Sequence, residues 1–121
     1  MKLTLLILLC ALTASAKINE ADAIKTLIGE AGGESLQCQT AVAEVIRNRG
    51  SLRGCYGLTN PVVAKASHRT IERARLAWIK SATSNLTNGC KFFGGDGLDN
   101  AYFAKLGKPV AVKIGRVNFY K

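Results

Sequence analysis

Hydrophobic residues recur at helical spacing in three segments of the chain, and each segment predicts a helix. The first helix begins after Asn19, which can cap its N-terminus, and it ends at the glycine pair at positions 32 and 33. Asp22 stands in the capping-box position, three residues after Asn19. The apolar positions of this helix, which we expect to be buried, are Ile24, Leu27, Ile28 and Ala31.

The second helix is predicted between Ser35, which can cap its start, and Gly50, which ends it. Its apolar residues form a stripe that we expect to be buried, namely Cys38, Ala41, Val42, Val45 and Ile46. Three polar residues of the same helix are expected to face outward: Gln37, Glu44 and Arg47. The pattern therefore predicts two consecutive helices separated by a short break that contains glycine.

The rest of the chain predicts one more helix and a small β element. The helix spans residues 70–81, with Ile71, Ala74 and Trp78 on its buried face. Glycines and an Asn-Pro pair make 51–66 a loop, and an Asn-Gly turn and a glycine-rich loop are expected at 88–89 and 94–97. Alternating apolar residues at 110–114 indicate a short strand. We therefore predict a mainly α fold of the α+β class with a short β element near the C-terminus.

The length of 121 residues allows one small domain. Residues 1–16 have the layout of a secretory signal peptide: Lys2, a short apolar run, and small residues at 14–16. The domain would then comprise residues 17–121, and the protein would be secreted or periplasmic, at the cell envelope. The apolar run is too short to span a membrane, so we expect no membrane insertion after cleavage.

Seventeen basic and eight acidic residues give the chain a net charge of +9. Such an excess of positive charge favours anionic partners. Secretion points to the anionic polymers of a cell envelope. The basic residues are scattered and form no dense tract, which argues against a nucleic-acid partner. We expect a monomer that needs no cofactor.

Three cysteines follow the predicted signal peptide: Cys38, Cys55 and Cys90. An oxidising compartment permits one disulfide among them, and the sequence leaves all three pairings open. The chain has no Cys-x-x-C pattern and no cysteine–histidine ligand spacing, so we predict no metal site.

The candidate chemistry lies at the break between the first two helices. Glu30 lies in the last turn of the first helix, where backbone carbonyls and apolar neighbours disfavour a charged carboxyl group. Glu34 lies at the start of the second helix, where free N–H groups favour the charge. Two acids in such different surroundings are typical of acid–base catalysis. We expect Glu30 to be the general acid that protonates a glycosidic oxygen, and Glu34 to stabilise the developing charge or to orient water.

Other chemistries have weaker support. His68 is the only histidine, and a surface position at the start of a helix explains it more simply than catalysis does. Both Ser/His/Asp and Cys/His nucleophile systems would depend on this one residue. The segment 29–33 lacks the Lys-Ser/Thr ending of a phosphate-binding loop. Glutamates near helix ends are commonly only solvated, so the spacing of Glu30 and Glu34 does not by itself establish a site.

Longer motifs extend these observations. Residues 29–34 read Gly-Glu-Ala-Gly-Gly-Glu, and residues 39–49 contain Gln-Thr-Ala-Val-Ala-Glu-Val and close on Asn-Arg. Thr-Asn-Gly-Cys-Lys-Phe-Phe follows at 87–93, and Ile-Gly-Arg-Val-Asn-Phe-Tyr at 114–120. These motifs resemble, in order and spacing, those of the cell-wall hydrolase family of spore-cortex-lytic enzymes (SleB/CwlJ type). The resemblance covers most of residues 17–121.

The resemblance implies a lysozyme-like fold and cleavage of peptidoglycan glycan strands between N-acetylmuramic acid and N-acetylglucosamine. Such an enzyme is a lytic transglycosylase or a muramidase, and the resemblance carries its catalytic acid onto Glu30. In a transglycosylase the same glutamate acts first as acid and then as base while the 6-hydroxyl of the sugar attacks, so no second carboxylate is obligatory. We expect these further residues to bind the substrate: Phe92, Phe93 and Tyr120 by stacking, and Asn88 by hydrogen bonding.

Three positions differ from the family pattern. Gly32 stands where the family has arginine, Arg116 where it has asparagine, and Val117 where it has histidine. The alternative hypothesis is therefore a non-catalytic peptidoglycan-binding module derived from the same fold. A basic protein that disrupts membranes is a third, but the helices do not carry lysine along a whole face. The sequence does not distinguish a bacterial enzyme from a phage endolysin.

Overall fold

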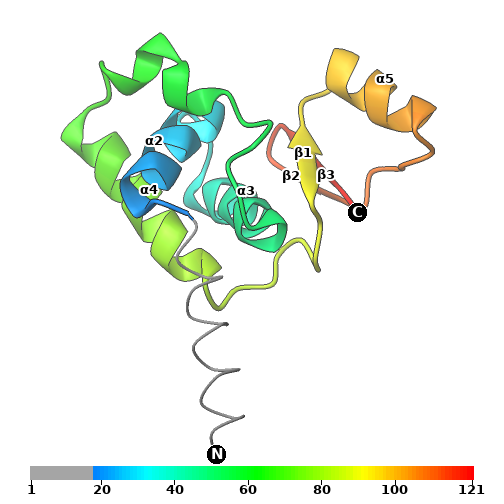
Figure 1. The fold of residues 1–121 in the computed structure, drawn as a ribbon, viewed down its shortest axis with the longest axis horizontal. Coiled ribbons are helices and arrows are strands. Elements are labelled where there is room, and N and C mark those ends of the chain that lie inside the picture. Colours follow the sequence, from blue (N-terminus) through cyan, green and yellow to red (C-terminus); the bar gives the residue numbers. More distant parts are fainter. Residues whose placement is uncertain (1–17) are drawn as a thin grey trace, which may run out of the picture.

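A computed structural model describes residues 18–121, so the predicted signal peptide at residues 1–16 lies outside the described range. The chain is mainly helical with one small antiparallel sheet, as the sequence predicts. Figure 1 shows α2, α3 and α4 gathered in one layer, with the sheet and α5 on the other side of α3. The elements are α2 (Glu20–Ala31), α3 (Leu36–Arg49), the 3-10 helices η1 (Gly57–Thr59) and η2 (Pro61–Val63), α4 (His68–Ser81), β1 (Phe92–Gly94), α5 (Leu98–Lys105), β2 (Val112–Ile114) and β3 (Val117–Tyr120).

The predicted ends of the first two helices are confirmed. The Asn19 side chain accepts a hydrogen bond from the backbone N–H of Asp22 at 3.0 Å, and Ser35 accepts one from Cys38 at 3.1 Å. Gly50 ends α3 with a φ of 74°, a left-handed conformation that glycine adopts without strain. These contacts are local, which is why the sequence alone reveals them.

The core lies between the three long helices. The apolar stripe predicted for α3 is fully buried, and it packs against Leu27 of α2 and Ala74 of α4. The prediction that Glu44 faces outward is wrong, because its side chain is only 3% exposed. Its carboxylate instead accepts hydrogen bonds from Ser84, Leu86 and Thr87, which supply the polar partners that a buried charge needs.

The sheet has the strand order β1-β3-β2, with both pairs antiparallel. The predicted strand near the C-terminus is confirmed at Val112–Ile114, whereas β1 and β3 were not predicted. Phe119 of β3 faces Phe93 on one side and Val112 on the other. A two-residue turn, in which Gly115 has a φ of 59°, joins β2 to β3.

Helix α5 was not predicted, and it is attached to the fold through few contacts. Phe103 is its only buried residue, and its ring stacks on that of Tyr120 with the centroids 4.2 Å apart. Leu98 and Tyr102 of the same helix are exposed. The helix therefore contacts the sheet through Phe103 and the side chain of Asn100, and all of its residues except Phe103 are exposed.

The predicted loop at 51–66 contains η1 and η2 and packs on α2 through two glycines. A Cβ atom on Gly29 would lie 1.9 Å from the carbonyl oxygen of Gly57, and one on Gly57 would lie 2.7 Å from Cγ of Glu30. Only glycine permits such a close approach of two backbones. This contact brings the start of η1 against the last turn of α2.

None of the three cysteines that the structure describes forms a disulfide. Cys38 and Cys90 are buried and Cys55 is half-buried. Burial, reinforced by the nearby carboxylate of Glu34, raises the pKa of the Cys38 thiol to about 11. This thiol therefore stays protonated near neutral pH, and its S–H group donates to the carbonyl of Ile114 at 3.4 Å.

Candidate functional site

Two hollows meet at the predicted site. The larger, a cleft of about 940 Å³, lies between residues of the helical layer and residues of β1 and α5. The smaller, of about 620 Å³, lies between the end of α2, the region of η2 and the start of α4. Three residues line both: Glu30, Glu34 and Arg116. The two glutamates singled out by the sequence are thus brought together with an arginine from the other end of the chain.

Glu30 is held at one oxygen and open at the other. The backbone N–H groups of Tyr56 and Gly57 both donate to its Oε1 atom at 2.9 Å. Its Oε2 atom receives no hydrogen bond from any described residue, and the side chain is only partly buried. The close contact between Gly29 and Gly57 is what places these two N–H groups over the carboxyl group.

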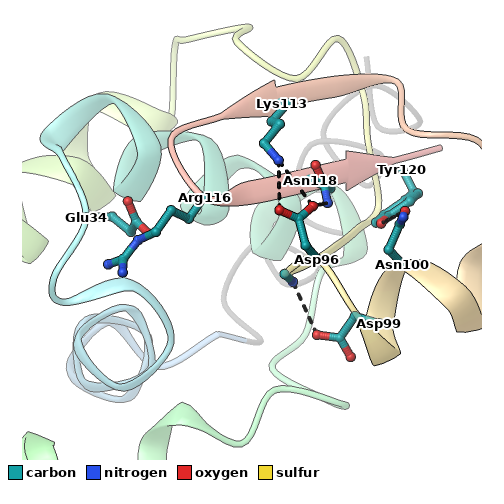
Figure 2. Close-up of polar contacts among 9 residues, drawn as sticks. Glu34, Asp96, Asp99, Asn100, Lys113, Arg116, Asn118 and Tyr120 are labelled. Atoms are coloured by element: carbon teal, nitrogen blue, oxygen red, sulfur yellow. Dashed lines mark hydrogen bonds and ion pairs between the residues drawn. The ribbon is translucent and has the colours of Figure 1, made fainter.

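Glu34, in the break between α2 and α3, is paired with Arg116, in the turn between β2 and β3. The Nε–H group of Arg116 donates to Oε1 of Glu34 at 3.0 Å. Figure 2 shows the arginine side chain directed from the β2–β3 turn toward Glu34. The side-chain amide of Gln39 holds the break between α2 and α3 in place. Its Nε2 donates to the backbone carbonyls of Gly32 and Glu34 at 3.5 and 3.2 Å.

Two of the four predicted substrate-binding residues line the cleft. Phe92 and Phe93 are half-buried in its wall, so part of each ring is open to it. Tyr120 is fully buried and stacks on Phe103, while its hydroxyl donates to the side chain of Asn100 at 3.0 Å. A buried ring offers no face to a sugar, so we leave Tyr120 out of the candidate site.

Asn88 lies at the turn that the sequence predicts and away from both hollows. Its φ of 53° is left-handed, its side chain is exposed, and its backbone carbonyl accepts a hydrogen bond from Lys121. The residue therefore serves the turn, and we also leave it out of the candidate site.

Sequence reasoning missed two exposed tyrosines that line the cleft. Tyr56 is 79% exposed and belongs to the segment that donates to Glu30, and Tyr102 is 59% exposed on α5. Exposed aromatic rings on the walls of a cleft are suited to stacking on flat faces of a ligand. No local pattern marks either residue, because both are brought to the cleft by tertiary packing.

Two further acids lie beside the sheet, Asp96 and Asp99, and of these only Asp99 lines the cleft. Asp96 is held between Lys113, at 3.0 Å, and the side-chain amide of Asn118, at 2.8 Å (Figure 2). The Asn118 hydrogen bond and the Lys113 charge lower the pKa of Asp96. Asp99, at the start of α5, accepts a hydrogen bond from the backbone N–H of Gly95 at 3.2 Å and lines the cleft.

The remaining possibilities raised by the sequence are a role for His68, a metal site and a membrane span. His68 is exposed at the first position of α4 and lines neither hollow. Within residues 18–121, no three His, Cys, Asp or Glu side chains gather in a group that could hold a metal ion. No helix of the same range is long and apolar enough to cross a membrane.

Comparison with known proteins gives no match to a family model, to a curated protein or to a solved structure. The functional proposal below therefore depends on the geometry of the cleft and on the motifs that its residues belong to.

Proposed function

We propose that this protein is a secreted enzyme that cleaves the glycan strand of peptidoglycan between N-acetylmuramic acid and N-acetylglucosamine. Glu30 is the general acid of the reaction. The observation that carries the proposal is the asymmetry of its carboxyl group. Two N–H groups fix Oε1, while Oε2 accepts no hydrogen bond from residues 18–121 and lies where two hollows meet.

This asymmetry supports Oε2 as the atom that carries the proton. When the carboxyl group of Glu30 is protonated, the oxygen that accepts two N–H bonds is the carbonyl oxygen, because a protonated oxygen donates a hydrogen bond instead. The transferable proton then belongs on Oε2, and the two hydrogen bonds hold that atom in a defined direction. Proton transfer by a positioned carboxyl group is the first step that breaking a glycosidic bond requires.

The two hollows support a polymeric substrate. A glycan strand can extend from the larger cleft into the smaller hollow, so that the bond to be broken lies over Glu30 with sugars on both sides. Phe92, Phe93, Tyr56 and Tyr102 supply aromatic surface in the larger cleft. Anionic polymers of the envelope attract the basic chain, an interaction that weakens as the salt concentration rises.

A single acid suffices for the transglycosylase form of the reaction. Oε2 of Glu30 gives its proton to the glycosidic oxygen as the C1–O bond breaks and positive charge develops on the sugar. The resulting carboxylate then removes the proton from the 6-hydroxyl of the same sugar as O6 bonds to C1. This route is supported by the pairing of Glu34 with Arg116, which commits the second glutamate elsewhere.

The test replaces Glu30 by glutamine. The amide oxygen of Glu30→Gln can accept the Tyr56 and Gly57 hydrogen bonds, so the fold and wall binding should be retained. Lysis of purified cell walls, followed by turbidity, should fall about 10²–10⁴-fold. The matched control is Glu72→Gln, an exposed glutamate of α4 outside both hollows, which should lyse normally.

Two other results would each favour a different function. Wall binding by the unaltered protein without any lysis would support the non-catalytic binding module. Leakage of wall-free liposomes would support membrane disruption. If lysis is observed, mass spectrometry of the products separates the two reaction types, because a transglycosylase leaves an anhydro end and a muramidase leaves a reducing end.

A further inference from the structure

Arg116 combines a fixed position with an exposed charge. Its side chain is 81% exposed, although its Nε–H group donates to Glu34, whose side chain is only 15% exposed. Ion pairs with so exposed a partner contribute little to stability. Of the basic residues in the described range, Arg116 alone lines both hollows beside Glu30. Its position therefore calls for a role other than holding the fold together.

The turn that carries Arg116 is docked on the start of α3. A Cβ atom on Gly115 would lie 2.9 Å from Oε2 of Glu34, so the turn contacts this carboxylate directly. The neighbouring carbonyl of Ile114 accepts the S–H group of Cys38. On the other side, Nη2 of the arginine comes within 3.8 Å of the place of a Cβ on Gly33. The guanidinium group is thus fixed through its Nε atom at the glycine break, while its Nη2 atom lies near Gly33.

We propose that Arg116 binds a carboxylate carried by the glycan, next to the bond that Glu30 cleaves, and that Glu34 positions it. Among residues 18–121, only the Nε atom of Arg116 is engaged in a hydrogen bond, to Glu34, so both Nη groups can bind a ligand. A guanidinium group binds a carboxylate through paired N–H bonds, with a geometry that lysine cannot reproduce. The inference rests on the proposed function and adds to it a preference for acidic glycans over neutral ones.

The other basic residues of the cleft are less suited to this role. Arg49 is committed to the backbone carbonyl of Arg53 and to the sulfur of Cys55. Lys108 lies over the ring of Phe92, with its Nζ 5.2 Å from the ring centroid. Neither residue lines the smaller hollow, so neither lies at the junction with Glu30.

The carboxylate can come from two sources on peptidoglycan. One is the lactyl group of muramic acid in strands without peptide, and the other is a peptide attached to that group. Three ligands distinguish them: peptide-free glycan fragments, the same fragments with their carboxylates amidated, and fragments that carry peptides. Amidation removes the charge and changes the shape very little.

The experiment measures binding by calorimetric titration of the full chain carrying Glu30→Gln, so that no ligand is cleaved. Adding Arg116→Gln should weaken binding of the peptide-free acidic fragments about tenfold or more. Binding of the amidated fragments should change little. Arg75→Gln, which removes an exposed arginine of α4 outside both hollows, is the matched control and should change neither. A larger effect on peptide-bearing fragments would assign the carboxylate to the peptide.

Two further variants test the arrangement. Arg116→Lys should restore only part of the preference for acidic fragments, and Glu34→Gln should reduce it while leaving binding of amidated fragments intact. Equal weakening of acidic and amidated ligands by Arg116→Gln, or no weakening of either, would overturn the inference and leave the proposed function standing. Arg116-dependent binding in a protein that never lyses walls would overturn only the catalytic proposal.

Discussion

Glu30 and Glu44 use the same device in two regions of the molecule. Each is a glutamate on a long helix, Glu30 on α2 and Glu44 on α3, and each accepts backbone N–H bonds from a later segment. The segment at 56–57 is bound in one case and the segment at 84–87 in the other. In both places a carboxylate fixes the path of a segment that lies outside the long helices and the sheet.

The two regions differ in how many oxygens of the carboxylate accept hydrogen bonds from the described residues. Glu44 is 3% exposed, and both of its oxygens accept hydrogen bonds, from two backbone N–H groups and from the hydroxyls of Ser84 and Thr87. Burial acts to raise the pKa of Glu44, but these hydrogen bonds outweigh it and the pKa is lowered. The described residues donate hydrogen bonds to one oxygen of Glu30 and none to the other. A saturated carboxylate can serve as a structural clamp, whereas one with a free oxygen in a cleft can also transfer a proton.

The largest expected effect is on stability. Glu44→Ala should lower the free energy of unfolding by about 3–5 kcal/mol, because several buried donors lose a common acceptor. Glu30→Ala should cost less, about 1–2 kcal/mol, because only two N–H groups lose their acceptor and one of them belongs to the exposed Tyr56. Urea denaturation of the two variants and of the unaltered protein measures both losses of unfolding free energy. Equal losses would contradict the distinction between clamp and acid.

A substitution of Gly29, one residue before Glu30, tests whether the placement of the two N–H groups over the Glu30 carboxyl group matters. Gly29→Ala would force its methyl group into the backbone of Gly57, so η1 must shift away from α2. We expect a loss of ~1–3 kcal/mol in stability, together with a loss of lysis. Gly95→Ala, where a Cβ would meet nothing within 4 Å, is the stability control. Unchanged lysis in Gly29→Ala would show that the two N–H bonds do not matter for the reaction.

The smallest expected effect is on the pH dependence of stability. Because folding lowers the pKa of Glu44, its contribution is present above the ordinary value of 4.5 and is lost as the pH falls through the folded pKa. Unfolding free energies measured from pH 6 downward should therefore fall more steeply for the unaltered protein than for Glu44→Gln. Parallel curves for the two proteins would argue that Glu44 is not ionised in the fold.

The sequence reveals what is encoded locally. The spacing of apolar residues and the caps at Asn19, Ser35 and Gly50 act within a few residues, so α2, α3 and their break were predicted correctly. The orientation of Glu44 was not, because its partners lie about forty residues further along the chain. Polar residues on a helix are expected outside unless the sequence shows a partner, and this partner is visible only in the fold.

The C-terminal part was harder to predict for related reasons. Helix α5 buries only Phe103, so it has no apolar stripe, and Gly97 at its start provides no side-chain cap. All four residues of β3 are buried, so the alternation that marks a half-buried strand is missing. At the candidate site the motif identified Glu30, but the Tyr56 N–H group that fixes it comes from 26 residues away in the chain.

The most direct test of the account asks whether Glu30 supplies a proton. Rates of the unaltered protein and of Glu30→Gln are compared on a natural muramic acid–glucosamine linkage and on a dinitrophenyl glycoside of the same sugars, whose leaving group departs without protonation. The account predicts a loss of about 10²–10⁴-fold on the natural linkage, with most of the rate retained on the activated one. The same loss on both substrates would contradict it.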